Sequence, residues 1–100
     1  MTEIRLLIQN EKGLHARASA KFVEVVESFD AAALVTKDDM SVSGDSIMGL
    51  LMLAASRGTS IEVVTRGPQA DALAEALAAL VANLFGEGYL AQVSGKAKTS

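Results

Sequence analysis

Two periodic patterns meet within the stretch Asn10-Glu11-Lys12-Gly13-Leu14-His15-Ala16-Arg17-Ala18-Ser19-Ala20. Before it, the run Ile4-Arg5-Leu6-Leu7-Ile8 places apolar residues at alternate positions, which predicts a strand over about residues 3–9. After it, apolar residues recur at helical spacing and predict a helix over about residues 16–28. The stretch therefore connects a strand to a helix through a short loop.

The only histidine of the chain, His15, falls where this helix is expected to begin, two residues after the turn residue Gly13. A helix N-terminus binds anions, because its first backbone N–H groups and the positive end of its dipole point the same way. Here those N–H groups belong to Ala16, Arg17 and Ala18, and the guanidinium of Arg17 adds a planar fork of donors that suits phosphate oxygens. A neutral, accessible imidazole at this point is suited to carry a phosphoryl group.

The alternative for these two side chains is unremarkable. A histidine at a strand–helix junction is often a solvated loop residue or a substitute N-cap, because most loop residues carry no function. Arg17 is then an ordinary surface residue of the first turn, although a cation is slightly misplaced near a helix N-terminus. The residue types alone leave both interpretations open.

Three further strands are expected. Asp38-Asp39 is a two-residue turn that joins a strand over residues 31–37 to one over residues 40–43. A fourth strand follows over residues 60–65, where β-branched residues are frequent.

Two further helices are expected. The first extends from Ile47 to Ala55, with Asp45 or Ser46 as its N-cap. The second has Pro68 at its first helical position and Gly86 as its stop. Its amphipathic stripe consists of Leu73, Leu77, Leu80, Val81 and Leu84.

The predicted order of elements is βαββαβα, and all the helices must cover the one apolar face of the sheet. This indicates an α+β open-faced sandwich in a single domain of residues 1–86. Periodicity alone is equally compatible with a ferredoxin-like βαββαβ fold that carries an added helix. Residues 87–100 lose the periodicity, and we expect them to form a mobile tail.

The short helix is apolar almost all round, although a two-turn helix can bury only about half of its surface. We expect Leu50, Leu53 and Ala54 to enter the core. The remaining apolar side chains would then form an exposed docking patch, in which methionine suits a surface shared by several partners: Ile47, Met48, Leu51 and Met52. The alternative is a fully buried helix beneath the tail.

Composition excludes several classes of function. The 100 residues contain no cysteine, which excludes disulfides and thiol chemistry and fits a reducing cytoplasm. The net charge of −3 argues against nucleic-acid binding. No apolar run approaches the roughly 20 residues of a membrane span, and no signal peptide is recognisable. We expect a cytoplasmic monomer without a metal site, a cofactor or insertion into a membrane.

The motif Gly13-Leu14-His15-Ala16-Arg17-Ala18-Ser19 resembles the active-site signature of HPr, the histidine phosphocarrier of the bacterial phosphoenolpyruvate-dependent phosphotransferase system. That signature is Gly, an aliphatic residue, His, a small residue, Arg, usually Pro, and then small residues. Ala18 departs from the proline. The rest of the chain to about Gly86 can be laid along the family, which implies four antiparallel strands beneath three helices.

The resemblance also implies a function. His15 would take a phosphoryl group from phosphorylated Enzyme I, on Nδ1 in HPr-like proteins, and pass it to a IIA-type protein. Arg17 would neutralise the phosphoryl group, and the chain would be a carrier rather than an enzyme. The helix at residues 47–55 would meet Enzyme I and the IIA acceptors. Ala18 and the Ala-rich helices are more similar to the nitrogen-type members, called NPr, or to proteobacterial members, which leaves the sugar and nitrogen branches both open.

Ser46 matches the serine that an ATP-dependent HPr kinase/phosphorylase modifies in some bacteria. As a plain N-cap it needs no such role, because serine is a preferred cap in any helix.

Two other functions remain as alternatives. One is a regulatory protein that docks through residues 47–52 and uses Ser46 as its switch. The other is an ACT-like small-ligand sensor, for which the sequence supplies no evident cleft. A self-contained enzyme is disfavoured, because His15 has no acid–base partner in a recognisable motif.

Overall fold

The structure is a computed structural model that describes residues 1–86. These residues form four strands and three helices. The elements are β1 (Thr2–Leu7), α1 (Ala16–Glu27), β2 (Ala32–Lys37), β3 (Met40–Ser43), α2 (Ile47–Met52), β4 (Ser60–Arg66), α3 (Ala70–Ala82) and a 3-10 turn η1 (Leu84–Gly86). The tail expected at residues 87–100 lies outside the described residues.

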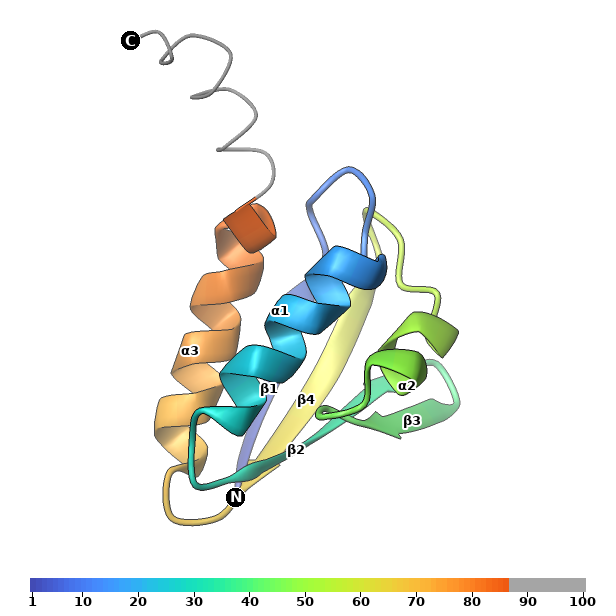
Figure 1. The fold of residues 1–100 in the computed structure, drawn as a ribbon. Coiled ribbons are helices and arrows are strands. Elements are labelled where there is room, and N and C mark those ends of the chain that lie inside the picture. Colours follow the sequence, from blue (N-terminus) through green and yellow to red (C-terminus); the bar gives the residue numbers. More distant parts are fainter. Residues whose placement is uncertain (87–100) are drawn as a thin grey trace, which may run out of the picture.

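The strands form one sheet in the order β1-β4-β2-β3, and each neighbouring pair is antiparallel. Helices α1, α2 and α3 all lie on the same side of this sheet (Figure 1). A ferredoxin-like fold would place β1 inside the sheet, whereas here β1 is an edge strand. The predicted open-faced α+β sandwich is therefore confirmed, and the ferredoxin-like alternative is excluded.

The alternation along β1 continues past its end and divides the two faces of the sheet. Leu6 and Ile8 point into the core and are 8% and 0% exposed, whereas Leu7 between them is 47% exposed. Ile8 also extends the pairing beyond β1, because its N–H donates to the carbonyl oxygen of Thr59 at 2.8 Å. The core between sheet and helices is filled by large, fully buried side chains, chiefly Phe22, Phe85, Ile8, Leu50, Ile61, Leu73 and Leu77.

The start of α3 differs from the expectation. Pro68 is not the first helical residue, because the N–H of Ala70 donates to the carbonyl oxygen of Gly67 and closes a turn there. Gly67 has a φ of +117°, which directs the chain out of β4 before the helix begins, and Gln69 is the N-cap.

Helix α2 is shorter than expected. It ends at Met52, and Ala54 adopts a left-handed conformation with a φ of +53°. This turn exposes Ala54 and buries Ala55, which is 2% exposed, so the prediction that Ala54 enters the core is wrong. Leu50 and Leu53 are buried as expected.

The chain turns sharply after α3. Leu84 and Phe85 both have positive φ, so Gly86 is the last residue of a 3-10 turn rather than the residue directly after the helix. The turn places the Phe85 ring in the core, and Lys21 Nζ donates to the Phe85 carbonyl oxygen at 3.0 Å. The end of the described chain is thereby fastened to α1.

Candidate functional site

His15 is the N-cap residue of α1. Its backbone is extended, with φ −81° and ψ −176°, and its side chain makes no capping hydrogen bond. The first bond of the helix runs from the N–H of Ser19 to the carbonyl oxygen of His15 at 2.8 Å. The N–H groups of residues 16–18 precede that bond and lie in the first turn, directly after the half-buried residue His15. The structure thus places His15 beside the N–H donors that the sequence predicted.

The loop before His15 is held against the segment that follows α2. Gly13 has a φ of +65°, and the N–H of Leu14 donates to the carbonyl oxygen of Ala55 at 2.9 Å. A Cβ at position 13 would lie 2.3 Å from that same oxygen, so only glycine fits there. Since glycine at this point allows the close approach, the loop and the end of α2 form one packed unit.

Arg17 and Ala16 are exposed on the first turn of α1, whereas Ala18 is fully buried. Arg17 is two residues from His15 on the same turn, and its guanidinium is open to solvent. Charge stabilisation and positioning are the main requirements of phosphoryl transfer, and a helix N-terminus with an adjacent guanidinium supplies both.

Ser46 is the N-cap of α2, where either Asp45 or Ser46 was expected. Its Oγ accepts a hydrogen bond from the N–H of Gly49 at 3.0 Å, and the side chain is half-buried. Asp45 instead accepts a hydrogen bond from the hydroxyl of Ser43. The hydroxyl of Ser46 therefore has the structural role of a cap, whatever else it does.

The apolar side chains of α2 divide as the two-turn argument requires. Met48 and Met52 are 69% and 64% exposed, and Ile47 is 40% exposed, whereas Leu51 is half-buried. We call these four residues the α2 patch. Helix α2 packs against α1 (Figure 1), so the α2 patch and the N-terminus of α1 lie on the helical side of the molecule.

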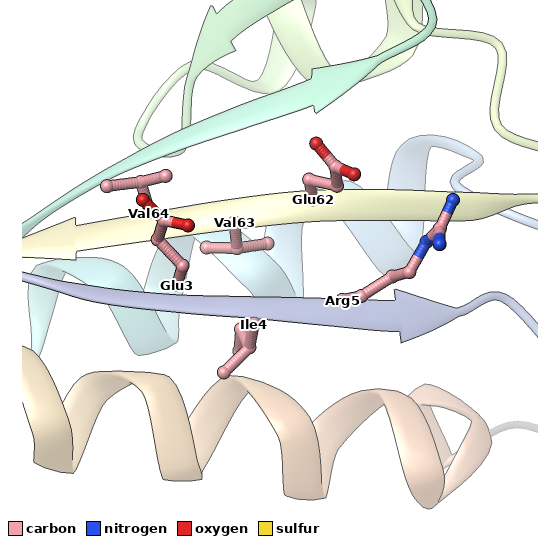
Figure 2. Close-up of a pocket in the computed structure, with 6 residues that line it drawn as sticks. All are labelled: Glu3, Ile4, Arg5, Glu62, Val63 and Val64. Carbon is pink, nitrogen blue, oxygen red and sulfur yellow. The ribbon is translucent and has the colours of Figure 1, made fainter.

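The far side of the sheet carries a shallow pocket of about 260 Å³ along β1 and β4. Figure 2 shows its lining residues: Ile4 points toward α3, whereas Glu62 and Arg5 extend from neighbouring positions of the two strands. The pocket includes no residue of the His15 loop or of α1. Within residues 1–86, no helix is long and apolar enough to cross a membrane.

Comparison with known proteins places this geometry in a family. The family model described as "PTS HPr component phosphorylation site" matches residues 2–83. The chain belongs to the PTS-HPr family. The phosphocarrier protein HPr of Neisseria meningitidis serogroup A is 49% identical over 81 residues, which are 81% of this chain and 91% of that protein. The phosphocarrier protein NPr of Escherichia coli K12 is 41% identical over 83 residues, or 82% of this chain and 88% of its own.

Solved structures agree with the family assignment. HPr-C-His from Thermoanaerobacter tengcongensis superposes with a TM-score of 0.83 at 36% identity, and the match covers 87% of this chain and 98% of that one. An HPr from Bacillus anthracis gives a TM-score of 0.76 at 38% identity, with 80% and 95% covered. The predicted family and its class of function, a phosphocarrier of the phosphotransferase system, are confirmed.

Sequence reasoning missed the side-chain hydrogen bonds made by two residues of this region. Asn10 is a buried polar side chain next to the loop, 2% exposed, and its Nδ2 donates to the carbonyl oxygen of Gly13 at 2.8 Å. Ser19 is fully buried, and its hydroxyl donates to the carbonyl oxygen of Leu14 at 3.3 Å. Both are polar residues at otherwise apolar positions, which is the signal that could have found them.

Proposed function

We propose that His15 accepts a phosphoryl group from phosphorylated Enzyme I and passes it to a IIA-type protein. One observation supports this most directly: His15 is the N-cap of α1, immediately before the backbone N–H groups of the first turn. A ring nitrogen of His15 forms a bond to phosphorus while the bond between phosphorus and Enzyme I breaks. In the second transfer the bond between His15 and phosphorus breaks while a bond between phosphorus and the IIA-type acceptor forms. His15 is thereby returned to its starting state.

The first turn of α1 stabilises the charge that arrives. The N–H groups of Ala16, Arg17 and Ala18 face an anion at the N-terminus, and the positive end of the helix dipole favours it. The guanidinium of Arg17 is exposed and offers paired donors to the phosphoryl oxygens. Because these groups suffice for charge stabilisation, no metal, cofactor or acid–base partner is required of the chain itself.

The α2 patch is the surface that we assign to partner docking. The α2 patch contains two strongly exposed methionines. It is also connected to the His15 loop, because the N–H of Leu14 is bonded to the carbonyl oxygen of Ala55 just beyond α2. Phosphoenolpyruvate supplies the phosphoryl group to Enzyme I in the cytoplasm, and we place this transfer there. A regulatory step on Ser46 would act here too, because Ser46 adjoins the α2 patch.

The test is intact mass after incubation with phosphoenolpyruvate and a bacterial Enzyme I, with wild type and His15→Ala side by side. The expected result is a gain of one phosphoryl group in the wild type, lost in acid and absent from His15→Ala. No gain with an Enzyme I that phosphorylates another HPr would contradict the carrier function. That outcome would favour a docking protein that is regulated at Ser46.

A further inference from the structure

Asn10 is a buried polar residue of the loop that connects β1 to His15, here called the His15 loop. Its exposed fraction is 2%, and an amide that is buried without hydrogen bonds is strongly destabilising. The side chain is therefore placed by its bonds rather than by solvent. Its side-chain Nδ2 donates to the carbonyl oxygen of Gly13 at 2.8 Å. The backbone carbonyl oxygen of Asn10 accepts the N–H of Gly13 at 3.1 Å.

The carbonyl oxygen of Gly13 is shared with His15. It also accepts the backbone N–H of His15 at 2.9 Å, so the amide of Asn10 and the peptide of His15 meet on one acceptor. The position of that oxygen sets the direction of the His15 N–H, and with it the direction in which the Cα–Cβ bond leaves the backbone. A shift of the Gly13 carbonyl would therefore turn the imidazole.

The other side of the loop is fixed by different groups. The N–H of Leu14 is bonded to Ala55, and the Leu14 carbonyl oxygen accepts the hydroxyl of Ser19. Without the amide of Asn10, the Gly13 carbonyl would retain the weakly directed bond that closes over two residues to His15. The peptide between Gly13 and Leu14 would then be anchored at its N–H by Ala55, and its carbonyl would tilt about that bond.

From these contacts we infer that Asn10 is a positioning residue for His15, which fixes the imidazole through the carbonyl of Gly13. This inference rests on the proposed function, in which transfer through His15 depends on orientation. A misplacement of about 1 Å can cost up to about 100-fold in rate. Docking would be unaffected, because Asn10 is buried and does not belong to the α2 patch.

The experiment compares Asn10→Ala with Thr65→Val, using the chain as the substrate of Enzyme I. Thr65 is also fully buried, and its hydroxyl donates to the Ala70 carbonyl oxygen at 2.8 Å. It lies at the opposite end of the sheet, since β4 pairs Thr65 with Thr2 and Ser60 with Leu7. The matched pair therefore removes one buried side-chain bond near His15 and one far from it.

We expect Asn10→Ala to lower kcat about tenfold without a change in KM, and Thr65→Val to leave both unchanged. Urea unfolding at the assay temperature shows whether both variants are folded there. If Asn10→Ala fails to fold, Asn10→Ser takes its place, because its hydroxyl leaves a smaller cavity yet is one bond too short to reach Gly13. An unchanged kcat, or an equal loss of kcat in Thr65→Val, would overturn the inference.

A second measurement decides the matter without Enzyme I. Backbone order parameters of Gly13, Leu14 and His15 should fall from about 0.85 toward 0.6 in the Asn10 variant and stay high in Thr65→Val. If the wild type accepts no phosphoryl group, the proposed function fails. The order parameters still test whether Asn10 holds the loop before His15. Unchanged order parameters at all three positions would refute the positioning role.

Discussion

The backbone N–H of Leu14 donates a 2.9 Å hydrogen bond to the carbonyl oxygen of Ala55. This bond joins the residue before His15 to the segment that follows α2, and the backbone of Gly13 packs against the same carbonyl. His15 and the α2 patch are consequently joined through one packed segment. A partner that docks on α2 meets His15 in a fixed geometry, which is what in-line transfer between two proteins requires.

The close approach at Gly13 predicts a large effect of one added methyl group. A Cβ in Gly13→Ala would lie 2.3 Å from the Ala55 oxygen, and the φ of +65° adds backbone strain. Gly58→Ala is the control, because φ is +91° there but no atom lies within 4 Å. We expect Gly58→Ala to cost about 1–2 kcal/mol from strain alone, and Gly13→Ala about 1–3 kcal/mol more from the overlap. Urea unfolding measures both, and equal losses would contradict the packing of Gly13 on Ala55.

Arg17 should matter for transfer and not for stability. It is exposed, so Arg17→Ala should change the free energy of unfolding by less than about 0.5 kcal/mol. Loss of charge-assisted hydrogen bonds of about 1.5–3 kcal/mol should slow transfer from Enzyme I about 10- to 100-fold. Arg17→Lys keeps the charge without the planar fork, so its transfer rate should lie between that of the wild type and that of Arg17→Ala. A transfer rate in Arg17→Ala equal to that of the wild type would show that the guanidinium does not contact the phosphoryl group.

The α2 patch gives a prediction about docking with a control on the opposite face. Met48→Ala and Met52→Ala remove exposed side chains, so both variants should fold normally and raise KM for Enzyme I with little change in kcat. Leu34, on β2, is 45% exposed on the side of the sheet without helices, and Leu34→Ala should leave KM unchanged. A rise in KM for Leu34→Ala alone would place the docking surface on the sheet instead.

Local periodicity predicted the fold because each strand and helix here buries one face. The alternation of Leu6, Leu7 and Ile8 and the turn at Asp38-Asp39 both correspond to observed structure. The errors fall at helix ends: at the start of α3, where Gln69 rather than a residue before Pro68 is the N-cap, and where the chain leaves α2 and α3. At Leu84–Phe85 the backbone becomes left-handed, so Phe85 rather than Leu84 enters the core. The spacing of four residues from Val81 to Phe85 was the available signal, but backbone reversal depends on tertiary packing.

The candidate site divides in the same way. The position of His15 at a helix start follows from local pattern, since Gly13 and the apolar spacing after it are visible in the sequence. The contact of Gly13 with Ala55 joins residues 42 positions apart, and the sharing of the Gly13 carbonyl by Asn10 and His15 needs coordinates. Single-sequence reasoning therefore placed His15 at the helix start and missed the groups that hold its loop.

Ser46 separates a structural role from a regulatory one. Ser46→Ala removes the acceptor of the 3.0 Å bond from the Gly49 N–H and should cost about 1 kcal/mol, whereas Ser46→Asp keeps an acceptor at the cap and should cost less. Ser43→Ala, which alters an exposed hydroxyl on the neighbouring strand, should stay within about 0.5 kcal/mol of the wild type. Urea unfolding of the three variants checks this order.

The regulatory role concerns docking rather than stability. In Ser46→Asp a negative charge would stand directly before Ile47 and Met48, two exposed members of the α2 patch. A partner that covers the patch would have to desolvate this charge, so KM for Enzyme I should rise while kcat changes little. Ser43→Asp adds the same charge three residues earlier, on β3 and outside the patch, and should leave KM near the wild-type value. An equal rise in both variants would show a general effect of negative charge, and Ser46 would then be a helix cap alone.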